Sequence, residues 1–329
     1  MLVKISFTDW WNGFDIRDNF ITRTLDGRIK YAIVDEPEQA DFVFCSVWKK
    51  DCFKYNCPRI LYTGENYIPD FNIYDYAIGF SELEFGDRYI RYPLYLANYE
   101  NTCRVLEEKK LLKGNELDRS FCSFVVSNGT EADNYRDMLF EKLMEYRFVS
   151  SGGRYRNNIN CPNGVNNKAD FLRQYKFNIA CENVSSEGYC TEKIVEAFAA
   201  NTIPIYWGDP RVVKYFNPKA FINCHECGSI EEVVSRVKQV DENPDEYMEM
   251  LAEPALIDGY YSFEAMRNRF AEWLAEILGQ DKESAYRRAR YGFSQLYEQK
   301  WIEIMAGEDK LTKGKKYKQR IKKILKRGE

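Results

Sequence analysis

The sequence of 329 residues contains a single histidine, His225, and this scarcity excludes the commonest nucleophilic sites. A Ser-His-Asp or Cys-His arrangement uses a histidine as its base, so one histidine leaves little room for either. The patterns G-x-G-x-x-G and G-x-x-x-x-G-K-[ST] are also missing. Their absence argues against a dinucleotide-binding site and against a P-loop.

The sequence also lacks export and membrane-spanning signals. No stretch approaches the roughly 18 apolar residues of a transmembrane helix, and the start, MLVKISFTDWW, has no basic region followed by an apolar run and a cleavage site. Ten cysteines without an export signal are expected to be reduced thiols, which indicates the cytosol. The C-x-x-C pattern at residues 224–227 includes His225, but a second clear ligand pair is missing, so we expect no metal site.

What the sequence does contain is typical of a globular protein, with 45% hydrophobic and 30% charged residues. A chain of this length can form two domains that each bury their own core. The aromatic share of 16% is high. Such a share suits a sugar-stacking surface and equally an ordinary core.

Two series of alternating strand and helix patterns predict two α/β domains. In the first series, runs such as LVKISF, ADFVFCSV and RILYTGEN are separated by polar segments, as in a parallel sheet with crossover helices. The second series begins with a strand at residues 121–126 and a helix at 135–146, and residues 100–118 between the series are charged and show no strand pattern. We therefore predict two Rossmann-like domains at residues 1–117 and 118–306 and a basic tail at 307–329.

The stretch FNIACENVSSEGYCTEKIVEAFAANTIPIYWGDP, residues 177–210, places polar side chains between two predicted strands. Residues 182–190 form a predicted loop, and Thr191 can cap a helix at the carboxyl end of the sheet, where α/β proteins bind ligands. The first turn of such a helix favours an anion such as phosphate, and Lys193 strengthens that preference. The alternative is an ordinary capped helix with solvated charges in its first turn.

Three more polar residues of this stretch can bind hydroxyl groups. Glu192 is not suited to a phosphate and is better explained as an acceptor for the adjacent hydroxyls of a ribose or a sugar, and Asn183 and Tyr189 add hydrogen-bonding groups to the same loop. The pattern therefore predicts a site for a phosphorylated sugar or nucleotide.

Three elements of this stretch resemble the signature of the α-1,3/1,4-fucosyltransferases, especially their bacterial members. These elements are Cys181-Glu182-Asn183, Tyr189-Cys190-Thr191-Glu192-Lys193 and Pro204-Ile205-Tyr206-Trp207-Gly208-Asp209-Pro210. Cys181 departs from the pattern, because the family usually has phenylalanine there. That change can loosen the packing under the loop, but it removes no polar group.

The resemblance runs from about residue 5 to about residue 275. Asp9-Trp10-Trp11 is similar to an aromatic pair that opens the bacterial enzymes, and Tyr62-Thr63-Gly64-Glu65-Asn66 is similar to part of their acceptor domain. FVVSNGTEADNYRDMLFEKL resembles the segment that carries their phosphate-binding arginine. Four blocks in the family's order argue against a chance similarity.

The resemblance implies a GT-B fold in which the C-terminal domain binds GDP-fucose and the N-terminal domain binds the acceptor sugar. It also implies a single inverting displacement, which needs a base that is ionised near neutral pH. Glu65 matches the family's proposed base, and its place after the predicted strand RILYTG puts it at the carboxyl end of that strand, facing the cleft. The alternative is a loop glutamate that caps a backbone N–H group.

The resemblance also implies how the leaving diphosphate is stabilised. The sequence has no Asp-x-Asp, with which many sugar transferases hold a metal ion, so no cofactor is expected and a divalent cation would at most stimulate the reaction. Arg136 and Lys193 match the family positions that take over this task, although each alone could be an ordinary surface cation. Gly153 and Arg154 match a glycine-rich loop near the donor, or simply form a tight turn.

The acceptor side is assigned to Trp10, Trp11 and Asn66. Core packing after the first strand explains the two tryptophans about as well as a sugar platform does.

The C-terminal tail is strongly basic. Residues 310–327 carry ten lysines and arginines and no acid, while the whole chain has a formal net charge of −4. Tyr317, Ile321, Ile324 and Leu325 fall at helical spacing on one face, which predicts docking on an anionic membrane surface. A disordered tail is an alternative, and nucleic-acid binding is another, but the rest of the chain is acidic and contains no recognisable nucleic-acid module.

Together these patterns predict an inverting fucosyltransferase at the inner, cytoplasmic face of a membrane. It would move L-fucose from GDP-fucose to a GlcNAc hydroxyl, O3 in the first instance, of an N-acetyllactosamine-type or lipid-linked glycan. Two alternatives stay open: a GT-B transferase with another nucleotide sugar, and a glycan-binding protein without catalysis. The choice between a 1,3 and a 1,4 linkage is also open.

Overall fold

The first half of the chain forms a six-stranded sheet. The structure is a computed structural model that describes residues 2–107, 112–129, 132–257 and 262–305. The strand order is β2-β1-β3-β4-β5-β6, and all neighbouring strands are parallel. The strands are β1 (Val3–Thr8), β2 (Tyr31–Ile33), β3 (Phe42–Cys45), β4 (Arg59–Tyr62), β5 (Tyr76–Gly79) and β6 (Tyr89–Arg91). The parallel sheet predicted from the apolar runs is confirmed.

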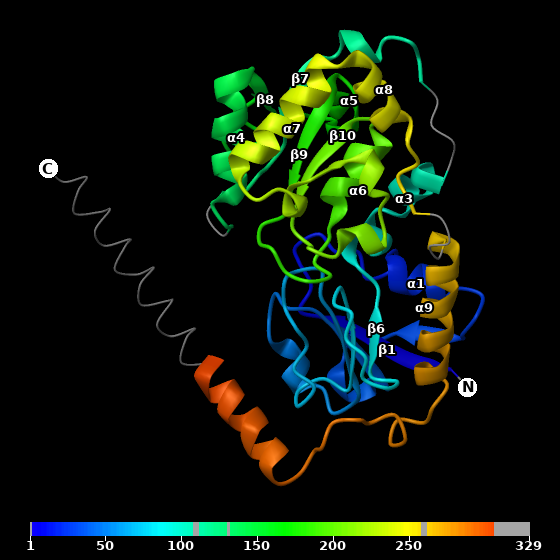
Figure 1. Cartoon of the computed structure of the whole chain (residues 1–329). Coiled ribbons are helices and arrows are strands. Elements are labelled where there is room, and N and C mark those ends of the chain that lie inside the picture. The colour runs from blue at the N-terminus through cyan, green and yellow to red at the C-terminus, as the bar shows by residue number, and fades with distance from the viewer. Residues whose placement is uncertain (1, 108–111, 130–131, 258–261, 306–329) are drawn as a thin grey trace, which may run out of the picture.

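The second half forms a five-stranded parallel sheet in the order β11-β10-β9-β7-β8 (Figure 1). Its strands are β7 (Ser120–Phe124), β8 (Val149–Ser151), β9 (Tyr175–Cys181), β10 (Ile203–Trp207) and β11 (Ile222–Asn223). Two Rossmann-like sheets are thus confirmed. The short edge strands β8 and β11, like β6 in the first sheet, were not predicted, because two or three residues carry no readable periodicity.

Helices cover both sheets. They are α1 (Phe20–Leu25), α2 (Leu94–Asn98), α3 (Glu100–Glu107), α4 (Tyr135–Tyr146), α5 (Lys168–Leu172), α6 (Glu192–Ala199), α7 (Ile230–Glu242), α8 (Pro244–Ala252) and α9 (Phe263–Leu278). A further helix spans residues 293–305 at the end of the described chain. The predicted helix at 135–146 and the predicted start of α6 after Thr191 are both confirmed.

Each sheet has one reversal point, the topological switch point at which the chain begins to add strands on the other side of the first strand. β1 lies between β2 and β3, and β7 lies between β8 and β9. In open parallel sheets the loops at the carboxyl ends diverge at such a point and leave room for a ligand. The loops after β7 and β9 therefore frame the site that the sequence predicts in the second sheet.

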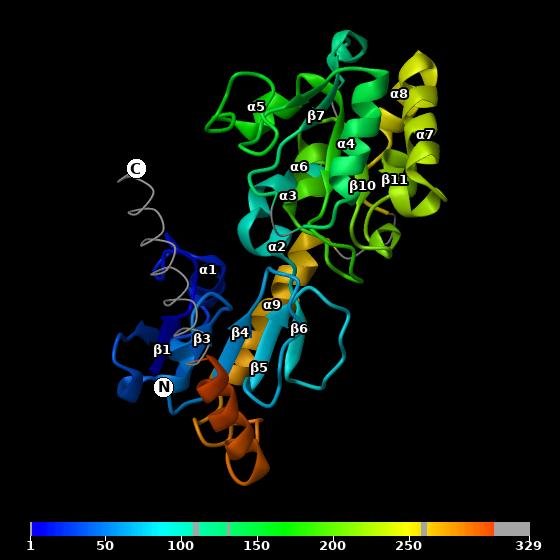
Figure 2. The same ribbon diagram turned by 90° about the vertical axis from the view of Figure 1, so that its left-hand side faces the viewer.

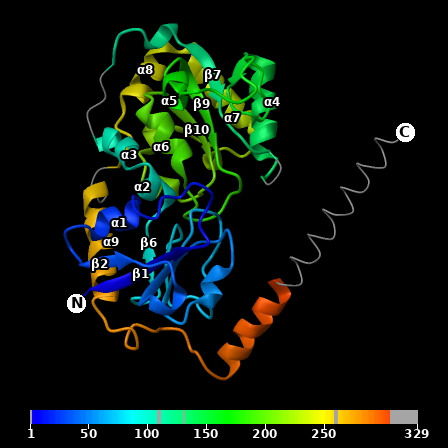
Figure 3. The same ribbon diagram turned by 180° about the vertical axis from the view of Figure 1, so that it is seen from behind.

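Helix α9 returns to the first sheet, which changes the domain boundary expected from the sequence. The Phe270 ring stacks on Tyr92 at 4.3 Å between centroids, and the Trp273 indole donates to the Asp87 carbonyl at 2.8 Å. Figure 2 shows α9 along the first sheet, and Figure 3 shows it beside α1. The range 118–306 does not form one domain, because its last part packs its aromatic face on the first sheet, and an amphipathic pattern does not reveal which sheet a helix will cover.

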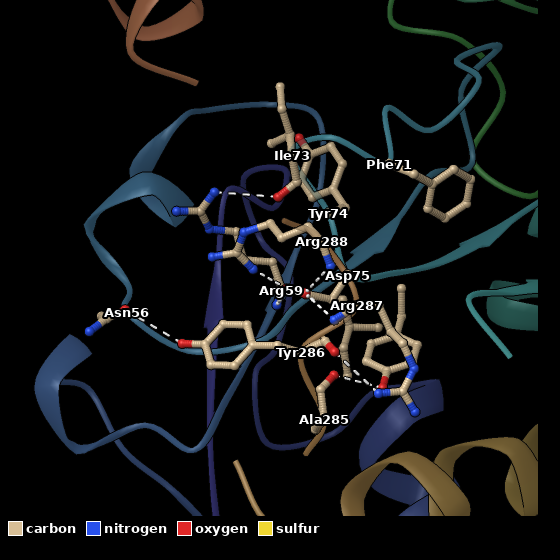
Figure 4. A network of polar contacts seen from close by, with 12 residues as sticks. Asn56, Arg59, Phe71, Ile73, Tyr74, Asp75, Ala285, Tyr286, Arg287 and Arg288 are labelled. Carbon is tan, nitrogen blue, oxygen red and sulfur yellow. Dashed lines mark hydrogen bonds and ion pairs between the residues drawn. The ribbon is translucent and has the colours of Figure 1, made fainter. Parts of the chain in front are cut away.

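Asp75 fixes the segment that follows α9 to the first sheet (Figure 4). Its side chain is fully buried. One carboxylate oxygen accepts the backbone N–H groups of Arg287 at 2.8 Å and Arg288 at 2.9 Å, and the other accepts the Arg59 N–H at 2.8 Å and pairs with the Arg288 guanidinium. Four donors from two distant parts of the chain thus converge on one carboxylate.

Replacing Asp75 with alanine should therefore destabilise the protein strongly. Three backbone N–H groups and a buried guanidinium would lose their acceptor, at a cost of about 3–5 kcal/mol. Urea unfolding followed by circular dichroism measures this loss. Asp87→Ala is the matched control, because Asp87 pairs with Arg287 at the surface and should cost less than about 1 kcal/mol. Equal losses for the two variants would contradict the role given to Asp75.

Candidate active site

The polar stretch predicted as a ligand site lies at the carboxyl end of β9. Glu182 follows the strand directly, and its side chain is completely buried. One carboxylate oxygen accepts the Thr191 N–H at 2.7 Å, and the other accepts the Thr191 hydroxyl and the Lys193 ammonium, each at 2.7 Å. Glu182 therefore ties the end of β9 to the start of α6.

Lys193 is positioned by carboxylates on both sides. Its Nζ atom lies 2.7 Å from Glu182 and 3.6 Å from Glu192. Burial disfavours the ammonium, but these two carboxylates outweigh burial and raise the pKa of Lys193 above its ordinary value. Burial likewise disfavours the Glu192 carboxylate, but Lys193 and Lys168 lower its pKa. Both groups are therefore charged at neutral pH, as a phosphate and hydroxyl site requires.

Gly208 makes room for Glu182. A Cβ atom at Gly208 would lie 2.4 Å from the Glu182 Cγ atom, closer than packed carbon atoms approach. The glycine of the Pro204 to Pro210 element therefore serves the buried carboxylate, and a side chain there would displace it.

Arg136, which the resemblance assigns to the leaving diphosphate, is buried and is not the surface cation that stood as the alternative. It is 1% exposed, and its two terminal nitrogens donate to the Asn183 side-chain oxygen at 2.8 Å and to the Asn128 carbonyl at 2.5 Å. It thus joins the loop after β7 to the loop after β9, the two loops that frame the reversal point of the sheet. Asn183 is held by this contact, and its own carbonyl accepts the Asp133 N–H at 2.7 Å.

Gly153 and Arg154 lie after β8, on the loop that follows the edge strand. A Cβ atom at Gly153 would lie 1.9 Å from the Val126 carbonyl oxygen, so only glycine allows the two loops to approach this closely. Arg154 is exposed. The close approach of the two loops explains the glycine at position 153, and Arg154 lies on the same loop with an exposed side chain.

Tyr189 links the donor loop to the first sheet. Its ring is buried and packs edge to face on Phe80, with centroids 5.2 Å apart, just after β5. Gly188 beside it has a φ angle of +79°, and a Cβ atom there would lie 2.8 Å from the Phe80 carbonyl oxygen. The loop therefore touches the N-terminal domain through a residue that must be glycine.

Glu65 is exposed on the loop after β4, as the strand pattern predicted. The Thr63 hydroxyl and the Tyr67 N–H both donate to the Glu65 carbonyl, at 2.9 Å and 2.7 Å, which fixes the loop backbone. Burial raises the pKa of the Tyr62 phenol, and the charges of Glu65 and Glu192 add to this effect. Glu65 from one domain and Glu192 from the other therefore lie within electrostatic reach of the same hydroxyl.

The aromatic pair after β1 divides into a core residue and a half-buried one. Trp10 is 6% exposed, stacks on Phe14 at 3.9 Å and on Tyr62 at 5.5 Å, and donates its indole N–H to the Phe44 carbonyl at 3.2 Å. Core packing thus explains Trp10. Trp11 is only partly buried against the same cluster, and Asn66 is exposed next to Glu65. The face that remains for a sugar is that of Trp11.

An ion cluster also joins the two domains. Glu82, after β5, accepts a hydrogen bond from Lys214 at 2.5 Å and lies 3.4 Å from Arg211, and the Tyr215 hydroxyl donates to it. Burial opposes ionisation of Glu82, but Lys214 and Tyr215 outweigh it and lower its pKa. These contacts join the two domains next to Tyr189.

The possible metal ligands in the described part of the chain are its His, Cys, Asp and Glu side chains. No three of these side chains are close enough together to hold a metal ion.

The Nε2 atom of His225 lies 3.1 Å from the Gly208 carbonyl oxygen, and the His225 ring stacks beside Trp207. A surface cavity of about 740 Å³ lies between β11, α7 and α8 and contains none of the predicted site residues.

Two residues of the site were not assigned to it from the sequence. Glu182 was named only as part of the motif Cys181-Glu182-Asn183, without a role, and Thr191 was interpreted only as a helix cap. The structure joins both to Lys193. The available signal was a glutamate directly after a buried strand, a place where an unpaired carboxylate would be costly.

Two family models match the chain. The model described as Alpha-(1,3)-fucosyltransferase FucT N-terminal domain matches residues 5–98, and the model described as Glycosyltransferase family 10 (fucosyltransferase) C-term matches residues 117–252. The first range contains Glu65, and the second contains the whole stretch from β9 to β10. The resemblance seen in the sequence is confirmed.

Curated relatives match most of the chain. Alpha-(1,3)-fucosyltransferase FucT of Helicobacter pylori is 34% identical over 301 residues, which cover 78% of this chain and 61% of the relative. A putative fucosyltransferase of Acanthamoeba polyphaga mimivirus is 24% identical, covering 75% of this chain and 42% of the relative. The chain thus spans less than two thirds of the length of these relatives.

Solved structures agree in fold over nearly the whole chain. A crystal structure of an α1,3-fucosyltransferase with GDP-fucose has a TM-score of 0.74 and 32% identity, covering 87% of this chain and 92% of that one. The corresponding structure with GDP has a TM-score of 0.73 and 33% identity, covering 85% and 91%. These matches confirm the expected GT-B arrangement of two Rossmann-like domains.

Proposed function

Because this chain belongs to the glycosyltransferase family 10 of fucosyltransferases, we propose that it transfers L-fucose from GDP-β-L-fucose to the GlcNAc O3 hydroxyl of a Galβ-GlcNAc-type acceptor. The observation that carries the proposal is the agreement of both domains, in sequence and in fold, with a fucosyltransferase that binds GDP-fucose. The charged stretch at the reversal point of the second sheet supplies the groups that such a donor needs.

In this proposal Glu65 is the general base. The acceptor oxygen attacks the fucose C1 atom as the bond from C1 to the GDP oxygen breaks, and the acceptor proton passes to the Glu65 carboxylate. Attack from the face opposite to GDP inverts the β-linked donor to an α-linked product. The position of Glu65 at the carboxyl end of β4, in electrostatic reach of the donor loop, supports this role.

The leaving diphosphate would be held by fixed groups of the second domain. Lys193 and the first turn of α6 supply positive charge and N–H donors, and Glu192 accepts hydroxyl groups of the donor. Arg136 braces the two loops around the donor through Asn183 and Asn128. This arrangement would not require a metal ion.

The first prediction for this function is a transfer reaction that survives EDTA. N-acetyllactosamine incubated with GDP-fucose, the purified chain and EDTA should gain the mass of one fucose, measured by mass spectrometry, and release GDP. Loss of the reaction with EDTA, restored by one metal ion, would overturn metal independence. Turnover only with another nucleotide sugar would replace the donor, and acceptor binding without any GDP release would indicate a binding protein.

The second prediction concerns the base. Glu65→Gln keeps the shape of the side chain but cannot take a proton, so kcat should fall by about a hundredfold or more, while GDP binding stays unchanged. Glu38→Gln is the control, because Glu38 is exposed in the same domain and lies before β3, at the opposite edge of the sheet. Transfer by Glu65→Gln within threefold of the wild-type rate would rule out this assignment.

We further propose that the C-terminal end of the chain docks on an anionic membrane surface. No described helix has both the length and the apolar character needed to cross a bilayer. The helix at residues 293–305 exposes large apolar side chains, with Phe293 92%, Ile304 60% and Leu296 57% exposed. The ten cations at residues 310–327, which lie outside the described residues, begin five positions after residue 305, the last described residue of this helix. Apolar contact and cations together are typical of peripheral docking.

Vesicle sedimentation tests this docking. The full chain should bind vesicles that contain phosphatidylserine and not vesicles of phosphatidylcholine alone, and binding should weaken with salt. Deleting residues 310–329 or changing Phe293 to Glu should each reduce binding. Gln299→Ala, which changes no charge on the same helix at an exposed position, is the control. Unchanged binding after the deletion would contradict the proposal.

A further inference from the structure

We propose that Glu182 is a positioning residue that acts on the donor through Lys193 and Thr191, so that the first turn of α6 faces the donor diphosphate. This inference rests on the proposed function of the site. Glu182 does not reach the surface, since its side chain is completely buried. It therefore acts through its neighbours and not by touching a ligand.

The position of Glu182 is strongly determined. Its backbone N–H donates to the Trp207 carbonyl at 2.8 Å, which continues the pairing of β9 with β10. On one side, the absence of a side chain at Gly208 leaves the space that the Glu182 side chain occupies. The carboxylate is thus a fixed point between two central strands, and any group bound to it takes its position from the sheet.

Thr191 shows what the carboxylate does to the helix start. A threonine at this position usually caps the helix by accepting from the N–H groups of the first turn. Thr191 makes no such bond, because its hydroxyl donates to Glu182 and accepts from Lys193 at 2.9 Å. Glu182 therefore holds the Thr191 hydroxyl away from the N–H groups of the first turn of α6, and a helix start that is not capped by this hydroxyl favours an anion.

Lys193 receives both its position and its charge from the same carboxylate. A largely buried ammonium without a counter-ion would tend to lose its proton. The titratable groups around it are Glu182 at the end of β9, Tyr189 in the loop, Glu192 and Glu196 on α6, and Tyr99 at the end of α2. Among these, Glu182 is the group in direct hydrogen-bond contact with the Nζ atom.

A buried glutamate elsewhere in the same domain provides the matched control. Glu116 is 1% exposed, accepts the N–H groups of Lys113 and Gly114, and lies 3.5 Å from Arg119. It lies before β7, at the opposite edge of the sheet from the first turn of α6. Glu116→Gln removes a comparable buried charge without touching the helix start.

The test is a double-mutant cycle measured by calorimetric titration with GDP. Glu182→Gln should weaken GDP binding by about tenfold or more in the wild-type chain, because a charged hydrogen bond to Lys193 is lost. In a Lys193→Met background the same change should alter binding by less than about twofold, since the residue through which it acts is gone. Glu116→Gln should leave GDP binding unchanged in both backgrounds.

A pH series adds a readout that a purely structural role would not change. Wild-type GDP affinity should change little from about pH 7.5 to about pH 9, because Lys193 remains charged across this range. In Glu182→Gln the ammonium loses its counter-ion, its pKa falls, and GDP affinity should decrease as the pH rises. The same slope in both proteins would overturn the proposal.

A second pair of variants keeps the test decisive if Glu182→Gln does not fold. Thr191→Val removes the hydroxyl that links Glu182 to Lys193, and Thr191→Ser retains it. GDP binding should fall at least about fivefold in the first and stay near the wild-type value in the second.

The outcomes separate this inference from the proposed function. Unchanged GDP binding in Glu182→Gln, or an equal loss in both Lys193 backgrounds, would overturn the positioning role while leaving the function intact. A wild-type chain that bound GDP but transferred no fucose would overturn the function alone. A wild-type chain that bound no GDP would overturn both.

Discussion

The two domains depend on one shared apolar core. Its members from the second domain include Ile194, Val195 and Phe198 on α6, and they lie in the same cluster as Tyr95 on α2 and Phe270 on α9. Burial of apolar surface is the main favourable term in folding, so this cluster holds the sheets together more strongly than the polar contacts at the surface can. The chain passes from the first domain to the second before β7 and returns before α9. Both domains therefore contribute side chains to this core.

Helix α6 therefore has two tasks at once. Its apolar face lies in the shared core, while its first turn carries Glu192 and Lys193 at the end of the second sheet. A ligand at this turn is bound to a helix that cannot move without disturbing the contact between domains. The same rule holds for Tyr189, whose ring packs on Phe80 of the first domain. The geometry of the donor site therefore depends on the same side-chain contacts that hold the two domains together.

Local signals in the sequence predicted local structure well. The helix start after Thr191 and the helix at residues 135–146 follow from capping and periodicity, which neighbouring residues determine. Contacts between distant residues were not predictable in this way. Asp75 and Arg288, which form an ion pair, are 213 positions apart in the sequence. Which of the two sheets α9 packs on depends on which sheet face the other helices leave uncovered. The contacts of Arg136 with Asn183 and Asn128 were not predicted either, since a helix pattern does not show which loops fold over a polar residue.

The attachment of the last helix gives the two proposals a common geometry. The helix at residues 293–305 is held on the first domain, with Trp301 packed on Phe53 at 6.0 Å and Glu298 paired with Arg59 at 2.8 Å. Figure 1 shows it at the end of that domain away from the second sheet. In our proposals the first domain binds the acceptor and the end of the chain binds the membrane. Docking would then bring the acceptor half next to the lipid, where a lipid-linked glycan is presented, and leave the donor half open to the nucleotide sugar in solution.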